Sequence, residues 1–222
     1  MISMDTINNL IEGNITYRKE QFPSHKEELE KSIKYGQKPQ ALVITCCDSR
    51  ITPFLITGCK PGDLFVVRNI GNFVPPYSHD DTFQSFYAVI EYALEVLEIK
   101  NIIVCGHTHC GACKSLHDDL SNKQKLPNVR KWLKLGLTAK QHVLKNKHLY
   151  TTQEELYRQT EKQSLICQLE HLKTYPIINE KLDSKQLNIH GWYYHLENGS
   201  IEYYDRENEE FKDITQYNHI LD

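Results

Sequence analysis

Short apolar runs alternate with helix-like patterns through the middle of the chain. The runs are Ala41–Thr45, Leu64–Val67 and Asn101–Cys105. Continuous apolar runs of this length are typical of strands that are buried on both faces. Between the second and third runs, residues 82–99 carry apolar positions three and four apart, which predicts a helix. Strands that alternate with helices predict βαβ crossovers and a mostly parallel sheet with flanking helices.

The N-terminal segment has a different pattern. Residues 4–35 are polar, with scattered apolar positions at helical spacing, and Pro23 followed by Ser24 divides them into two predicted helices. Their apolar surface is too small to form a core. We therefore expect residues 1–38 to form a helical arm that packs on the main body or on a partner subunit.

The C-terminal third predicts one long helix and a hairpin. Thr152 and Glu155 have the spacing of a capping box, which opens a helix running towards Tyr175 and ending before Pro176. Residues 187–196 and 201–204 flank the turn signal Asn198–Gly199, so they predict an antiparallel hairpin at one edge of the sheet. Residues 115–150 are Lys-rich and predict mostly helical surface structure. We expect residues 1–222 to form a single α/β domain.

Composition and charge exclude several classes of protein. The chain has 222 residues, of which 40% are hydrophobic and 25% charged, as in ordinary globular proteins. Its 26 basic and 29 acidic residues leave a net charge of −3, which argues against nucleic acid or an anionic membrane as a partner. No apolar run approaches the roughly 18 residues that span a bilayer. The first residues lack the pattern of a secretion signal, so we expect a cytoplasmic protein.

The cysteine content changes this picture. Seven cysteines are an odd number, and without a secretion signal they argue against a disulfide framework. Reduced thiols together with 11 histidines point instead to a metal site or a reactive cysteine.

Two of the predicted strands end in loops that carry chemically active side chains. The first loop is Cys46-Cys47-Asp48-Ser49-Arg50, and the second is Gly106-His107-Thr108-His109-Cys110-Gly111. Ligands of open parallel sheets bind beyond the carboxyl ends of the strands, near the point where the strand order reverses. If the two strands are neighbours, both loops open into one crevice.

Cys46, His107 and Cys110 are the candidate ligands of a zinc ion. Zinc favours thiolate and imidazole ligands, and a site with only three protein ligands keeps a fourth position for water, which is the catalytic arrangement. Beside them, Arg50 would keep Asp48 ionised. An ionised Asp48 could then accept a hydrogen bond from zinc-bound hydroxide and orient it toward an electrophile.

Other interpretations of these residues remain open. Cys47 would be the ligand if the predicted end of the strand were wrong by one residue. Cys110 and Cys113 have the spacing of a redox pair. A structural zinc site without turnover would need a fourth ligand, which Cys113 or His109 could supply. That interpretation would leave Asp48 and Arg50 without a purpose.

The two motifs together resemble the β-class carbonic anhydrases. The resemblance extends over roughly residues 20–205 and includes further segments, namely Gly36-Gln37-x-Pro39, Pro61–Asn69, Val74-Pro-Pro76, Glu91-Tyr92-Ala and Ile189-His-Gly-Trp192. Either core motif alone is moderately specific. Both motifs in order, each at a predicted strand end, are strongly specific.

The resemblance implies a role for each matching residue. Cys46, His107 and Cys110 match the family's zinc ligands, with one zinc ion per subunit, and Asp48 and Arg50 match its catalytic pair. Five further positions match residues that bind the substrate. Gln37 matches a glutamine that hydrogen-bonds the substrate, Gly111 a glycine whose N–H faces the substrate oxygen, and Phe65, Ile70 and Tyr92 the apolar wall of the carbon dioxide pocket.

The implied activity is the reversible hydration of carbon dioxide to bicarbonate and a proton. The alternative is a hydrolase of carbonyl sulfide or carbon disulfide, since such enzymes share the fold and the zinc motif. Some family members carry a tryptophan where this chain has Val43, and their aspartate can move onto the zinc ion. Val43 therefore favours the subgroup whose zinc site stays open. The family also implies a homodimer, often paired into a tetramer, in which part of the pocket wall comes from the partner.

Overall fold

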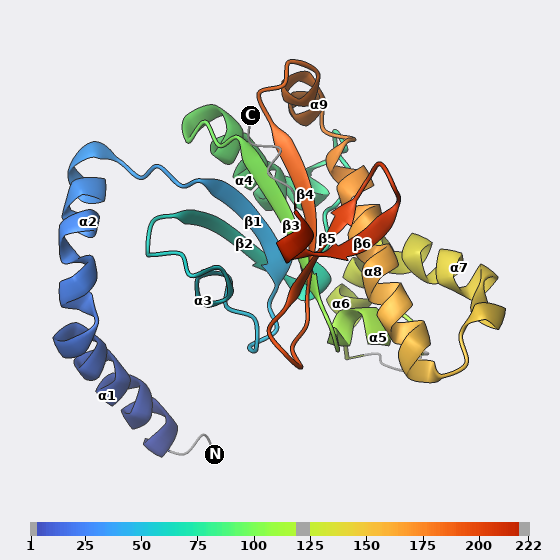
Figure 1. Ribbon diagram of the computed structural model, residues 1–222, viewed down its shortest axis with the longest axis horizontal. Coiled ribbons are helices and arrows are strands. Elements are labelled where there is room, and N and C mark those ends of the chain that lie inside the picture. Colours follow the sequence, from blue (N-terminus) through green and yellow to red (C-terminus); the bar gives the residue numbers. More distant parts are fainter. Residues whose placement is uncertain (1–3, 119–124, 218–222) are drawn as a thin grey trace.

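The centre of the molecule is a six-stranded sheet with the strand order β2-β1-β3-β4-β5-β6 (Figure 1). The computed structural model describes residues 4–118 and 125–217. Its strands are β1 Ala41–Cys46, β2 Leu64–Asn69, β3 Asn101–His107, β4 Asn188–Tyr194, β5 Ile201–Asp205 and β6 Glu210–Asp213. The first four are parallel to one another, and β5 and β6 are antiparallel. The predicted α/β fold and its antiparallel edge are confirmed, and β6 extends that edge beyond the prediction.

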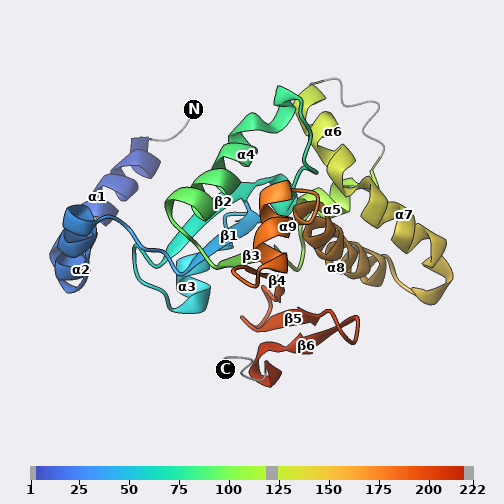
Figure 2. The same ribbon diagram turned by 90° about the horizontal axis from the view of Figure 1, so that it is seen from above.

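Helices cover the sheet on both faces, which explains the continuous apolar runs. All six residues of β1 are buried. Leu42 and Ile44 pack beneath α4 (Gln84–Glu91), α8 (Gln153–Leu172) and α9 (Pro176–Asp183). On the opposite face, Val43 belongs to a smaller cluster that includes Ile56 from α3 (Pro53–Thr57). Figure 2 shows α4, α8 and α9 on one side of the sheet and the short α3 on the other.

The predicted helix ends agree with the structure at α8 and differ elsewhere. The Thr152 side chain accepts a hydrogen bond from the Glu155 N–H, and the Glu155 carboxylate accepts one from the Thr152 N–H, so the predicted capping box is present. Pro176 does more than end α8, because it lies in the first turn of α9, where its missing N–H costs nothing. The predicted helix over residues 82–99 is divided into a 3₁₀ turn Asp81–Phe83, α4 and a π-helical turn Tyr92–Val96.

The Lys-rich stretch is helical where it is described. Its first residue, Ser115, ends α5 (Gly111–Ser115), and α6 (Pro127–Leu133) and α7 (Leu137–Lys145) lie within it. Residues 119–124 of the stretch lie outside the described residues. Among the helices that the structure describes, none combines the length and the apolar character that a membrane crossing requires.

The N-terminal arm consists of α1 (Met4–Glu20) and α2 (Phe22–Tyr35), which stand apart from the sheet (Figures 1 and 2). The two helices separate at Gln21, slightly before the predicted break at Pro23, because proline is well accommodated in a first helical turn. The apolar side chains of α1 are 46–68% exposed, namely Ile7, Leu10, Ile11 and Ile15. This arm therefore presents an apolar surface that the rest of the same chain leaves uncovered.

Gly191 in β4 provides a test of the packing between α8 and the sheet. A Cβ atom at this position would lie 2.5 Å from Leu165 Cδ2 and 2.8 Å from Leu169 Cδ1. We expect Gly191→Ala to lower the free energy of unfolding by about 1–3 kcal/mol, because both leucines are buried and would have to move. Urea titration measures the change. Gly13→Ala is the control, because a Cβ atom there meets open space, and an equal loss in both variants would contradict the packing described.

Candidate metal centre

Three side chains of types that ligate metal ions meet where β1 and β3 end. Cys46 is the last residue of β1, His107 is the last residue of β3, and Cys110 lies immediately before α5. Their ligand atoms all lie within 4.8 Å of one another, and all three residues are buried. This separation is close to what donors about 2.0–2.3 Å from one shared ion require. The strand order reverses beside β1, so the group occupies the position where parallel sheets bind ligands.

The loop between His107 and Cys110 turns through an unusual backbone conformation. His109 has a φ of 57°, in the left-handed region that non-glycine residues seldom adopt. The turn is held to the neighbouring strand by a hydrogen bond from the Thr108 N–H to the Tyr194 carbonyl. This bend allows two side chains three residues apart to face the same point.

The hydrogen bond of the His107 ring fixes the tautomer that a metal ligand needs. Its Nδ1 lies 2.8 Å from the Thr108 carbonyl oxygen, and a carbonyl can only accept, so Nδ1 carries the proton. In the neutral ring, the lone pair is therefore on Nε2. That atom is buried and has no hydrogen-bond partner among the described residues. A buried, unpartnered acceptor aimed at two thiols is the feature that best fits a bound metal ion.

The two thiols are protonated in the absence of a cation. The hydrogen bond with Cys110, together with burial, raises the pKa of Cys46 to about 12. The neighbouring Cys113 thiol and burial raise the pKa of Cys110 well above its ordinary value. Only a strong positive charge can ionise two buried thiols so close together, and a divalent metal ion supplies it.

Gly71 also contributes to the centre, and the sequence analysis did not identify it. Its N–H lies 3.4 Å from Cys46 Sγ, where it can donate a hydrogen bond to the sulfur. Its φ is 83°, and a Cβ atom would lie only 2.8 Å from the Cβ of Ala112. Both the conformation and the crowding require glycine here.

Asp48 and Arg50 form a tight ion pair beside the centre. The guanidinium donates from Nε to Oδ1 at 2.9 Å and from NH2 to Oδ2 at 2.7 Å, and the Arg50 N–H also donates to Oδ1. These hydrogen bonds hold the pKa of Asp48 well below its usual range. Arg68 fixes the loop from the other side by donating to the Cys46 and Asp48 carbonyls.

The five residues expected to bind substrate do not all lie near this centre. Ile70 follows β2 and precedes Gly71, and Gly111 opens α5 next to Cys110, so both are close to the ligands. Phe65 pairs instead with Leu42, four residues before Cys46, which places it about 13 Å along the strand from the ligand end. Tyr92 stacks on Phe65 with ring centroids 6.0 Å apart. Gln37 is exposed in the connection between α2 and β1.

The residues considered as alternative metal ligands lie outside the cluster of Cys46, His107 and Cys110. Cys47 is exposed, and it is not part of the three-ligand cluster. His109 points away and contacts Glu197, with 2.6 Å between His109 Nε2 and Glu197 Oε1. Cys113 is buried beside Cys110, and neither it nor His109 belongs to the cluster. The described residues therefore offer three ligands at this point.

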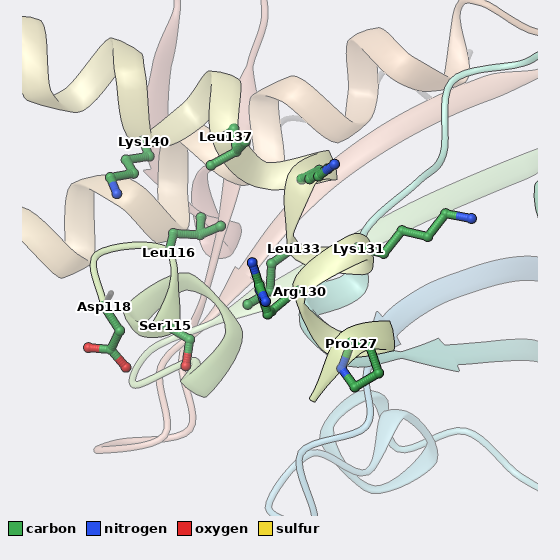
Figure 3. A pocket seen from close by; sticks show the side chains of 10 residues that line it. Ser115, Leu116, Asp118, Pro127, Arg130, Lys131, Leu133, Leu137 and Lys140 are labelled. Carbon is green, nitrogen blue, oxygen red and sulfur yellow. The ribbon is translucent and has the colours of Figure 1, made fainter. Parts of the chain in front are cut away.

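A separate hollow of about 520 Å³ lies over α5, α6 and α7 (Figure 3). Arg130 stands in it near Leu116 and Leu133, and Lys140 and Asp118 lie along its edge (Figure 3). Leu116 and Leu133 belong to the same apolar cluster as Cys46 and Cys110. None of the three ligands lines this hollow, so it is distinct from the metal centre.

Comparisons with known proteins agree with one another. The model of the family described as "Carbonic anhydrase" matches residues 41–201. A carbonic anhydrase of Synechocystis is 43% identical over 196 residues, which cover 88% of this chain and 70% of the relative.

Solved structures give the same result. The β-carbonic anhydrase CcaA superposes with a TM-score of 0.87 and 41% identity, over 94% of this chain and 99% of that one. A tetrameric β-carbonic anhydrase from the filamentous ascomycete Sordaria macrospora gives a TM-score of 0.79 at 28% identity, over 90% of this chain and 96% of the other.

The raised thiol pKa values predict a strong pH dependence of metal uptake. Cys46 and Cys110 each lose a proton when a metal ion binds, so two protons should be released per zinc ion near pH 7. The apparent association constant should then rise about 100-fold per pH unit, since each released proton contributes a factor of ten. Calorimetry in buffers of different ionisation enthalpy counts the protons. A release of fewer than one proton would show that the thiols are already ionised without the metal.

Proposed function

Since the chain belongs to the β-class carbonic anhydrase family, we propose that it hydrates carbon dioxide reversibly to bicarbonate and a proton at a zinc ion held by Cys46, His107 and Cys110. The single observation that carries the proposal is the buried cluster of two thiols and an unpartnered imidazole nitrogen beside a carboxylate–guanidinium pair. Carbonyl sulfide or carbon disulfide is the alternative substrate class.

Zinc is the metal that this donor set fits best. Two thiolates and one imidazole are the soft and intermediate ligands that zinc prefers, and three protein ligands suit a catalytic site. A bound zinc ion would act as a Lewis acid that lowers the pKa of its water ligand, although less strongly with two thiolate ligands than with three histidines.

Asp48 is suited to orienting the nucleophile. Its hydrogen bonds with Arg50 keep the carboxylate ionised, so it can accept a hydrogen bond from a water molecule in the site without taking its proton. The remaining lone pair of that water would then point toward carbon dioxide. The Gly111 N–H would stabilise the substrate oxygen that gains negative charge, an interaction worth about 3 kcal/mol in comparable sites.

We further propose that the fourth coordination position stays open. Both carboxylate oxygens of Asp48 accept hydrogen bonds from Arg50, which supports a carboxylate held away from the ligands. Val43 instead of tryptophan is consistent with this open arrangement.

The placement of Phe65 and Tyr92 supports a dimer with shared active sites. The two stacked rings lie at the far end of the strand from the ligands of their own chain, so their apolar surface is suited to a partner's pocket. The strand β2 that carries Phe65 lies at the edge of the sheet, where a second copy could approach. We propose that Gln37, which is exposed before β1, hydrogen-bonds the substrate in the same shared site.

The N-terminal arm supports the same assembly. Its exposed apolar side chains, such as Leu10 at 68%, need a surface to cover them, and we propose that the partner subunit provides it. One structural relative is described as tetrameric, which makes pairing of such dimers a reasonable extension. The seven cysteines are all unpaired, which suits a reducing compartment such as the cytoplasm.

Adjacent cysteines offer a matched test of the proposed activity. We expect Cys46→Ser to lose most of its zinc and its carbon dioxide hydration, because a ligand is removed. Cys47→Ser should keep both, since Cys47 is exposed and outside the cluster. Metal analysis and stopped-flow hydration assays measure the two properties. Assays of carbonyl sulfide and carbon disulfide hydrolysis in parallel distinguish the substrates, and turnover of a sulfur compound without hydration would overturn the assignment.

The pH profile tests which group titrates during turnover. The pKa of Asp48 lies well below its usual range, so this carboxylate is ionised at every pH from about 6 to 9 and adds no slope there. We expect kcat/KM for hydration to rise with pH across that window, because the water nucleophile must lose a proton. Stopped-flow measurements give the profile, and a flat one would contradict the proposed mechanism.

A further inference from the structure

A buried carboxylate lies behind the metal centre. Glu161 is in the middle of α8, and only 3% of it is exposed. Glu161 belongs to neither of the two sequence motifs, residues 46–50 and 106–111. Burial of a carboxylate is unfavourable unless hydrogen bonds and opposite charge compensate for the lost water.

Three donors converge on the Glu161 carboxylate. The Cys110 N–H donates to Oε1 at 2.9 Å, the Tyr193 hydroxyl donates to Oε2 at 2.6 Å, and Arg158 donates to Oε2 at 3.1 Å. Cys110 lies at the start of α5, where a backbone N–H has no partner within its own helix. The carboxylate therefore fixes the backbone of a metal ligand directly.

Arg158 extends this contact to the rest of the ligand loop. The same guanidinium donates to Glu197 Oε1 at 2.9 Å. The other oxygen of Glu197 accepts a hydrogen bond from the Thr108 hydroxyl at 2.7 Å. The residues that follow His107 and the backbone of Cys110 are thus held by one connected set of charged groups.

We infer that Glu161 is a positioning residue of the metal centre, which sets the direction of the Cys110 thiol by holding its backbone. The inference rests on the proposed zinc site. A carboxylate is needed because the Cys110 N–H and the Arg158 guanidinium, which meet its two oxygens, can only donate, whereas a glutamine would turn its NH2 group toward one of them. Loss of the contact would leave a buried N–H unsatisfied and free the ligand loop to shift.

Glu161→Gln tests this role, with Glu202→Gln as the matched control. Glu202 is another ion-paired carboxylate next to α8, less buried than Glu161, but its partners are Lys162 and His195 and it does not touch the ligand loop. The readouts are zinc content, the rate of zinc transfer to a chelator, and the absorption spectrum of the cobalt-substituted protein. Urea unfolding of the metal-free proteins measures stability separately.

We expect Glu161→Gln to release zinc about 10- to 100-fold faster than the wild type, as is typical when an outer-shell partner of a ligand is removed. Its cobalt spectrum should shift, because the thiolate geometry changes. Glu202→Gln should release zinc within about twofold of the wild-type rate and keep its spectrum, since its contacts lie elsewhere.

The outcomes distinguish a failure of this inference from a failure of the proposed function. If the wild type holds no zinc, the proposed function fails. If the wild type holds zinc and Glu161→Gln matches Glu202→Gln in release rate and spectrum, Glu161 only stabilises the fold and the inference is overturned. If Glu161→Gln does not fold, Glu161→Asp keeps the charge but withdraws the carboxylate by one methylene from the Cys110 N–H, and zinc release from this variant at the wild-type rate would overturn the inference instead.

Discussion

The parallel pairing of β1 with β3 is the constraint on which the rest of the site depends. It brings together Cys46 and His107, which are 61 residues apart in sequence, because Thr45 pairs with Cys105 and both strands end at the same edge. Both strands are buried on both faces. A shift of the pairing register by one residue would therefore turn every side chain of the shifted strand to the opposite face of the sheet. The packing of the core therefore fixes the positions of two of the three proposed ligands independently of any metal ion.

Charge is the second constraint, and it acts in opposite ways on the two halves of the site. Arg50 of the same chain compensates the negative charge of Asp48, so the carboxylate is ionised without help from a ligand. Cys46 and Cys110 are buried, and the nearby Arg50 guanidinium is paired with Asp48, so the pKa values of both thiols are raised and their ionised forms are unfavourable. A divalent cation removes that penalty, which is why the same burial that disfavours free thiolates favours a tightly held metal ion.

The sequence predicts those parts of the site that depend on local pattern. Cys46 and His107 were identifiable because apolar runs end just before them, and Cys110 because it follows His107 by three residues. The capping box at Thr152 likewise marks the start of α8. Glu161 was not identifiable, because a glutamate in a helix with other polar residues resembles a solvated position. Gly71 was missed since its role depends on a close approach to Ala112, which comes from a different part of the chain.

The polar residues of α8 explain how one helix serves both the core and the site. Glu161 and Gln168 are seven residues apart in α8, a spacing that keeps side chains near one face of a helix, and Tyr175 follows three residues after the helix ends. Glu161 accepts from the Cys110 N–H, Gln168 accepts from the Val74 N–H at 2.7 Å, and the Tyr175 hydroxyl donates to the Pro75 carbonyl at 2.7 Å. Leu165 and Leu169 lie between them and pack into the sheet. Because a helix is stiff, the loop after β3 and the loop after β2 are held at a fixed separation, and these two loops flank Cys46 at the end of β1.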